Sequence, residues 1–154
     1  VVISNQRILC RVVAFDSASQ SILLVRNREQ DWWYAPGGSW EHTKETLPEC
    51  ARREVLEETG IQVDIVAFLY NQTLYIQEQG STWLEQFWLA EPVGSMMVSS
   101  EHVDRFGLVE EARWFKQSEI EAVTVYPEVL QGSFWEDVVR VKQEGDRYLG
   151  HFAL

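Results

Sequence analysis

Short runs of β-branched and other apolar residues, separated by polar stretches, occupy much of the chain and indicate β-strands. Two longer runs flank the polar segment 77–80, which suits the connection of a β-hairpin. Before the middle of the chain, Ala35, Pro36 and the two glycines that follow them force a turn. We expect strands at residues 11–15, 21–25, 63–70, 82–90 and 113–116.

A helical segment with start and stop signals follows that turn. Thr46 and Glu49, three residues apart, match a capping box, in which each side chain accepts a hydrogen bond from the other residue's backbone N–H. Pro48 falls in the expected first turn, where its missing N–H is no loss, and Gly60 stands where a left-handed C-terminal cap belongs. The sequence therefore predicts a helix over Leu47–Thr59.

The last third of the chain is less regular. Residues 91–107 mix Pro, Gly, Ser and charged residues, which predicts a long loop, and residues 118–122 suit a short helical turn. Apolar residues recur at loosely helical spacing over 128–143, which predicts a final helix. Strands, one central helix, further strands and a final helix indicate an α/β (α+β) fold in a single domain over residues 1–154.

Charge and composition narrow the classes of function. The 154 residues carry 13 Lys and Arg against 24 Asp and Glu, a formal charge of −11, which argues against a binder of nucleic-acid polymers or anionic membranes. No apolar run approaches the ~20 residues of a membrane span, and no charged leader precedes an apolar segment at the start. With Cys10 and Cys50 as its two cysteines, the chain is expected to be cytoplasmic with reduced thiols.

Three glutamates of the predicted helix lie on its apolar side. At about 100° per residue, Glu54, Glu57 and Glu58 fall within the arc that the apolar residues of the helix define. Carboxylates at this spacing repel one another, are partly desolvated, and lie near the helix C-terminus, where the helix dipole disfavours negative charge. A bound cation would offset all three costs. Because the cluster offers only oxygen ligands, it predicts Mg²⁺ or Mn²⁺ rather than zinc, and Arg53 is placed to orient one carboxylate.

The same segment resembles the signature of the Nudix (MutT-like) hydrolases, Gly-x5-Glu-x7-Arg-Glu-apolar-x-Glu-Glu-x-Gly-apolar. Glu45, a spacer of seven residues and the run from Arg53 to Ile61 match each fixed position after the first glycine. That glycine would fall on Ser39, one residue after Gly38, so either the loop holds one extra residue or Ser39 replaces the glycine. We favour the extra residue, because Ala-Pro-Gly-Gly still precedes the loop as it does in the family.

The resemblance implies the Nudix fold, a mixed β-sheet between helices, and hydrolysis of a nucleoside diphosphate linked to another moiety. It implies Mg²⁺ or Mn²⁺ as cofactor and a small nucleotide as partner, with Glu54, Glu57 and Glu58 as metal ligands beside a backbone carbonyl of Gly38 or Ser39. The general base stays open between Glu54 and a glutamate of the later loop. The loop candidates are Glu101, Glu110 and Glu111, of which Glu111 is assigned to the catalytic set.

Further residues are candidates for holding the nucleotide. Arg26 and Arg28, just after the second strand, carry guanidinium groups suited to a diphosphate, and Arg11 is a weaker candidate of the same kind. A base would stack on an aromatic side chain, and Trp33 is assigned to the substrate site from the candidates Trp32, Trp33 and Trp40. Glutamates without a pattern of partners, Glu85 among them, are expected at the surface.

Three functions compete at this point. A metal-dependent pyrophosphohydrolase is favoured because all three helix glutamates are present. The second hypothesis is a nucleotide-binding or regulatory module without hydrolysis, and the altered loop at Gly38 and Ser39 is the observation that supports it. The third is a plain acidic interaction domain with an incidental site for a divalent cation, in keeping with the negative net charge. Residues 76–79 carry neither the Pro nor the Tyr associated with subfamilies for ADP-ribose or dinucleoside polyphosphates, so the nucleotide stays open. The apolar content is compatible with a homodimer.

Overall fold

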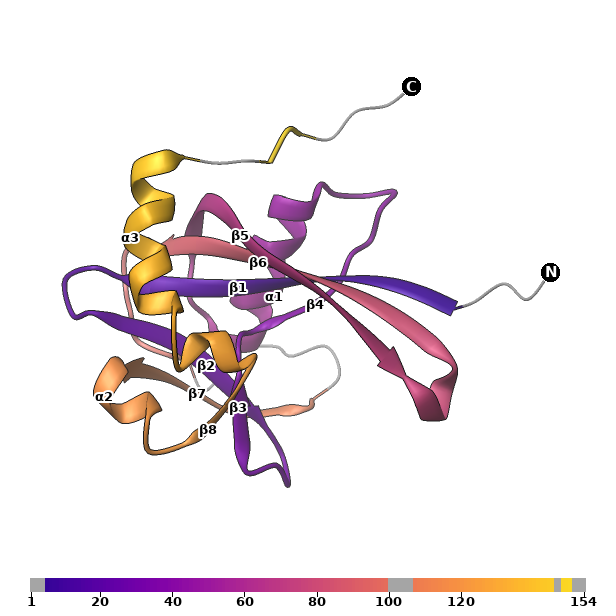
Figure 1. Ribbon diagram of the computed structural model, residues 1–154, viewed down its shortest axis with the longest axis horizontal. Helices are drawn as coiled ribbons and strands as arrows, with labels where there is room; N and C mark the ends of the chain where they lie inside the picture. The colour runs from indigo at the N-terminus through magenta and orange to yellow at the C-terminus, as the bar shows by residue number, and fades with distance from the viewer. Residues whose placement is uncertain (1–4, 100–106, 146–147, 151–154) are drawn as a thin grey trace.

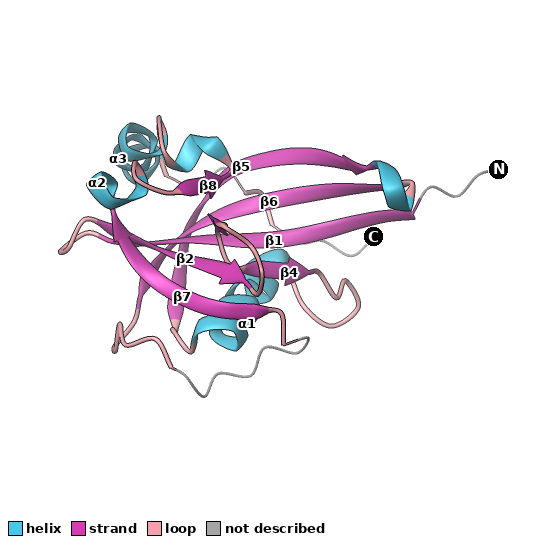
Figure 2. Cartoon of the chain, turned by 90° about the horizontal axis from the view of Figure 1, so that it is seen from below, coloured by secondary structure: helices cyan, strands magenta, loops and turns pink. Residues whose placement is uncertain are grey.

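A mixed β-sheet lies between helices in the computed structural model, which describes residues 5–99, 107–145 and 148–150 (Figures 1 and 2). Helix α1 (Leu47–Thr59) covers one face of the sheet and α3 (Phe134–Glu144) the other. Short helical turns occur at η1 (Gln77–Gln79), α2 (Gln117–Ile120) and η2 (Glu128–Leu130). The described strands are β1 (Asn5–Asp16), β2 (Ser21–Asn27), β3 (Trp32–Tyr34), β4 (Gly37–Ser39), β5 (Val63–Ile76), β6 (Ser81–Pro92), β7 (Val109–Lys116) and β8 (Thr124–Tyr126).

Strand β1 connects the two halves of the sheet. Along most of its length it runs parallel to β6, which pairs in turn with β5 as a long antiparallel hairpin. At its end β1 turns back into β2, which carries β3 and β7, and β8 lies parallel to β3. The main path of the sheet is therefore β5-β6-β1-β2-β3-β8, with β4 paired to β1 and β7 paired to β2.

Alternate residues of β1 serve two separate apolar cores, because successive side chains of a strand point to opposite faces. Cys10 and Val12 are buried in the core on the side of α1. Val13 and Phe15 are buried in the core on the side of α3, where Phe15 meets the ring of Phe134 edge-on at 6.1 Å between centroids. The position of β1 therefore determines how both helix layers sit on the sheet.

The central helix begins and ends where the sequence predicts. Thr46 N–H donates to the Glu49 carboxylate at 2.7 Å, and the Thr46 hydroxyl accepts from the Glu49 N–H, which completes the capping box. Gly60 adopts the left-handed conformation at φ 75°, and Ala51 and Val55 are fully buried against the sheet. No helix among the described residues is long and apolar enough to cross a membrane.

The predicted final helix over 128–143 is wrong in its first turn. A 3₁₀ turn, η2, ends at Leu130, and α3 begins only at Phe134, with Gly132 in the gap between them. Glycine costs about 1 kcal/mol relative to alanine inside a helix, which favours a break there. The strands are longer than predicted, because backbone pairing between β5 and β6 continues over residues whose side chains are exposed. Of the predicted loop 91–107, residues 100–106 lie outside the described residues.

Candidate active site

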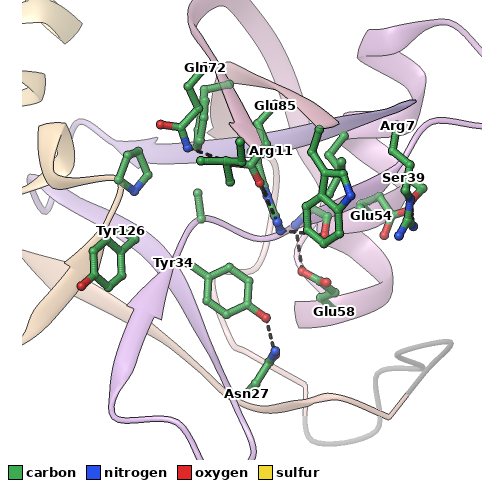
Figure 3. Close-up of a pocket in the computed structure, with 18 of the residues that line it drawn as sticks. Arg7, Arg11, Asn27, Tyr34, Ser39, Glu54, Glu58, Gln72, Glu85 and Tyr126 are labelled. Atoms are coloured by element: carbon green, nitrogen blue, oxygen red, sulfur yellow. Dashed lines mark hydrogen bonds and ion pairs between the residues drawn. The ribbon is translucent and has the colours of Figure 1, made fainter. Parts of the chain in front are cut away.

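A cavity of about 1150 Å³ opens between the two halves of the sheet. Strands β1, β5 and β6 form one wall, and β3, β8 and the segment leading into α1 form much of the remainder. Figure 3 shows Glu54 and Glu58 lying between Arg7 at one end of the view and Tyr126 at the other. The cavity therefore has an acidic middle part at Glu54 and Glu58. Arg7 lies at one end of it, and aromatic side chains, Tyr126 among them, lie at the other.

The wall formed by β1, β5 and β6 follows from the register of these strands. Residues with the same parity on each strand face the cavity, since side chains alternate along a strand. Across the three strands, the rows of lining residues are Arg7–Trp83–Leu74, Leu9–Glu85–Gln72 and Arg11–Phe87–Tyr70. Charged and polar side chains thus alternate with apolar ones on a surface that faces the three helix glutamates.

Glu54, Glu57 and Glu58 all line this cavity. The side chains of Glu54 and Glu57 are 13% and 33% exposed, and Glu58 is buried. Glu58 Oε2 accepts a hydrogen bond from the backbone N–H of Gly37 at 2.9 Å. The helical arc calculated from the sequence therefore places these carboxylates correctly, on the packed side of α1 rather than in open solvent.

Arg53 binds several carboxylates at once. Its Nε and Nη2 donate to the two oxygens of Glu45 at 2.9 and 2.7 Å, and Nη1 donates to Glu54 Oε1 at 2.7 Å and to Glu57 Oε2 at 3.5 Å. Hydrogen bonding from Arg53 lowers the pKa of Glu45, whereas burial raises the pKa of Glu54 in spite of Arg53. The guanidinium thus orients two of the three glutamates, one more than the sequence suggests.

The oxygen donors of the cavity are of the kind that a divalent cation needs. Within the described residues, no three carboxylate, His or Cys side chains converge as a ready metal cluster. The chemistry of the site nevertheless fits Mg²⁺ or Mn²⁺, because oxygen donors line one cavity and burial opposes the charge of Glu54. A Cβ added to Gly38 would fall 2.5 Å from the Glu54 carboxyl carbon, so the loop backbone lies directly against a carboxylate.

A family model described as the NUDIX domain matches residues 6–132 of this chain, which include the cavity wall and all three glutamates. The chain belongs to the Nudix family. Curated relatives include the 8-oxo-dGDP phosphatase NUDT18 of Homo sapiens, 29% identical over 117 residues, which make up 73% of this chain and 34% of that protein. The Danio rerio protein of the same name is 31% identical over 106 residues, or 67% of this chain and 30% of that protein.

The Nudix chain described here spans about a third of the length of these curated relatives. Among solved structures, a NUDIX hydrolase from Nitrosomonas europaea has a TM-score of 0.68 at 23% identity and covers 90% of this chain and 91% of its own. A UDP-X diphosphatase has a TM-score of 0.66 at 16% identity, over 94% of this chain and 66% of its own. These likenesses confirm the predicted fold, a mixed sheet between helices.

Arg53 contacts Glu54 and Glu57 from outside the cavity lining, and four further residues assigned from the sequence do not line the cavity of this Nudix chain. Arg26 donates to Glu111 at 2.9 Å and to the Gln30 carbonyl at 3.1 Å, and Arg28 is exposed. Glu111 pairs with Arg26 and does not line the cavity, and Glu101 lies outside the described residues. Arg26, Arg28 and Glu111 therefore lie outside the cavity in which phosphate binding and proton transfer were expected of them.

Trp33 is the fourth of these residues, and it lies in the apolar core. It is 7% exposed in the core on the side of α3, where its ring lies 4.7 Å from that of Phe115 between centroids. Its neighbour Trp32 lines the cavity instead, because consecutive residues of β3 face opposite ways. A packing role therefore replaces base stacking for Trp33.

Sequence reasoning also misplaced or missed several lining residues. Glu85, expected at the surface, is 5% exposed and pairs with Arg11, so that prediction is wrong. Tyr34 and Tyr126 join Trp32 at the aromatic end, and each of these two rings lies 5.4 Å from the Trp32 ring between centroids. Strand parity would have identified these residues, but only once the pairing partners of each strand were known.

Proposed function

We propose that this Nudix chain is a Mg²⁺- or Mn²⁺-dependent pyrophosphohydrolase that cleaves a nucleoside diphosphate linked to another moiety. One observation carries the proposal: the three glutamates of the Nudix helix line the same cavity as a group of three aromatic rings. A single cavity can therefore hold the diphosphate at the carboxylates while a base lies at the aromatic end.

The chain's own residues have separable tasks in this proposal. Glu54, Glu57 and Glu58 would hold the cation, with a backbone carbonyl of Gly38 or Ser39 beside them. A bound Mg²⁺ would neutralise the anionic diphosphate and acidify a water molecule. Arg53 keeps the carboxylates of Glu54 and Glu57 in place through Nη1.

The proton of the attacking water needs an acceptor within the cavity. Glu111 pairs with Arg26 and does not line the cavity, whereas Glu54 lines it with its carboxylate against the Gly38 backbone. We therefore assign proton transfer to Glu54, one of the candidates that the sequence left open. A positioned carboxylate in such a role typically contributes 10²- to 10⁴-fold in rate, roughly.

A base is assigned to the aromatic end of the cavity. The Trp32 and Tyr126 rings meet nearly at right angles, at 83°, and leave ring faces and edges along the cavity wall. Stacking of a base on one aromatic ring is worth about 1–3 kcal/mol. Asn27, which accepts a hydrogen bond from the Tyr34 hydroxyl, and Glu128 supply polar groups at this end for the edge of a base.

The printed names of the curated relatives supply a first substrate to test. Three of them are called 8-oxo-dGDP phosphatases, at 29–31% identity over about two thirds to three quarters of this chain. We therefore propose as first substrate an oxidised purine nucleoside diphosphate, whose terminal phosphate carries no further moiety, ahead of the linked substrates: nucleoside triphosphates, ADP-ribose and nucleotide sugars. The acidic cavity requires that such an anion be accompanied by the cation.

Hydrolysis of a nucleotide panel tests this proposal. The purified chain is expected to hydrolyse 8-oxo-dGDP in the presence of Mg²⁺ or Mn²⁺ and to lose the activity when EDTA removes the metal. The panel includes dGDP, dGTP, ADP-ribose, a nucleotide sugar and a dinucleoside polyphosphate, with released phosphate and nucleotide measured by chromatography. Binding of nucleotides without turnover of any of them would favour the non-hydrolytic module instead.

Substitution of Gly38 by Ala tests the close approach of the loop to Glu54. A methyl group there would press on the Glu54 carboxylate at 2.5 Å and displace it, so we expect turnover to fall roughly 10- to 100-fold. The measurement is kcat at saturating Mg²⁺. The matched control is Gly132→Ala, since a Cβ at Gly132 meets nothing within 4 Å. Full activity in Gly38→Ala would show that the site tolerates a wider loop.

A further inference from the structure

A series of hydrogen bonds crosses the cavity wall and ends on one of the Nudix glutamates (Figure 3). Gln72 Nε2 donates to Glu85 Oε2 at 2.7 Å, and Glu85 Oε1 accepts from Arg11 Nε at 2.9 Å. Arg11 Nη1 donates to the Gly37 carbonyl at 3.1 Å, and the Gly37 N–H donates to Glu58 Oε2 at 2.9 Å. Residues from β5, β6, β1 and β4 thus connect to α1.

The Arg11 guanidinium is committed to protein partners. Its Nε and Nη2 each lie 2.9 Å from Glu85 Oε1, while Nη1 contacts Gly37. Its Cζ lies 5.4 Å from the centroid of the Tyr34 ring, and the Arg11 and Glu85 side chains are only 16% and 6% exposed. Because all three guanidinium nitrogens contact protein groups, Arg11 supports the neighbouring backbone and is not free to bind a diphosphate.

We propose that Arg11 and Glu85 are positioning residues for the metal site, an inference that rests on the proposed pyrophosphohydrolase function. Gly37 adopts a φ of 155°, a backbone conformation that residues with a Cβ rarely adopt. Its two peptide groups therefore need contacts that hold them in place. Arg11 holds the peptide group after Gly37 through its carbonyl, and Glu58 holds the peptide group before it through its N–H. Fixing both peptide groups fixes the position of the Gly38 Cα, at which an added Cβ would fall 2.5 Å from the Glu54 carboxyl carbon.

Glu85 orients the Arg11 guanidinium and neutralises its charge. It accepts from Arg11 through Oε1 and from Gln72 through Oε2, so the buried carboxylate is fully engaged. A buried arginine without Glu85 would turn toward the nearby carboxylates of α1, since an unpaired buried charge is strongly disfavoured. As a neutral pair, Arg11 and Glu85 hold the loop without adding to the repulsion of an anionic substrate.

Replacement of Arg11 by Lys separates positioning from phosphate binding. Lysine keeps the positive charge but not the planar fork that reaches Glu85 and Gly37 together. We expect Mn²⁺, titrated without nucleotide and followed by electron paramagnetic resonance, to bind roughly ten-fold more weakly. At saturating metal, KM for the nucleotide should stay within about two-fold of wild type. Glu85→Gln, which keeps the shape of the side chain, should weaken Mn²⁺ binding in the same direction.

The control variant is Glu91→Gln on the same strand, whose carboxylate pairs with Lys142 and does not line the cavity. It should bind Mn²⁺ as wild type does, and thermal unfolding confirms that each variant is folded. Unchanged Mn²⁺ affinity in Arg11→Lys and Glu85→Gln would overturn the inference, as would a raised KM with unchanged Mn²⁺ affinity, which would make Arg11 a substrate ligand. Failure of the wild-type chain to bind Mn²⁺ would instead refute the proposed function and, with it, the metal site.

Discussion

Glu57→Gln is expected to lower kcat by about 10³-fold while the chain stays folded. The substitution keeps the size of the side chain but removes the negative charge that would bind the cation. Its effect on stability should be within about 0.5 kcal/mol, because the side chain is 33% exposed and its contact with Arg53 is long, at 3.5 Å. Steady-state kinetics at saturating Mg²⁺ and thermal unfolding measure the two effects separately.

Glu121→Gln is the matched control for this loss. Glu121 is exposed after α2 and does not line the cavity, so its substitution changes the net charge equally and should leave kcat unaltered. A fall in kcat in both variants would point to net charge rather than to a bound cation. Wild-type turnover in Glu57→Gln would remove the assigned carboxylate from the mechanism.

Gly37→Ala should produce the largest loss of stability in this region, about 3 kcal/mol or more. A Cβ at this position would lie 2.0 Å from the Cys10 carbonyl oxygen and 2.8 Å from the Arg11 Cα. Both atoms belong to the backbone of β1, which is paired to β6 and cannot move aside without breaking that pairing. Chemical denaturation gives the free energy of unfolding. The midpoint temperature of thermal unfolding, Tm, should fall by about 10 °C.

Gly132→Ala again provides the comparison. Its added methyl group has open space around it, so the free energy of unfolding should stay within about 1 kcal/mol of wild type. Equal stability of the two alanine variants would mean that β1 and β4 separate easily at Gly37. The hydrogen bonds from Arg11 and to Glu58 would then hold a flexible loop rather than a rigid one.

The parts of the site that could be predicted from the sequence depend on local signals. The bounds of α1 follow from Thr46, Glu49 and Gly60, which act through neighbouring backbone groups. The side on which Glu54 and Glu58 lie follows from the helical period alone. Neither inference requires any knowledge of what packs against the helix.

The parts that could not be predicted depend on strand register. Arg11 meets Glu85 only because β1 lies parallel to β6, a pairing between segments more than seventy residues apart. The sequence assigned Trp33 to the cavity, but Trp32 lines the cavity and Trp33 lies in the core. A strand of three residues is too short for its sequence to show which side chain faces the core. The break at Gly132 was signalled by the glycine, but the loosely apolar pattern around it favoured an unbroken helix.

The alternation along β1 makes this strand intolerant of any change in length. A single residue inserted between Arg11 and Val12 would shift every preceding position by one, so that Arg11, which lines the cavity, would turn into the core beneath α1, and Cys10 would leave that core for the cavity. A charged side chain would then enter the apolar core beneath α1, and an apolar side chain would take its place in the cavity that the glutamates line. Variation in β1 is therefore confined to exchanges of one residue for another on the same face of the strand.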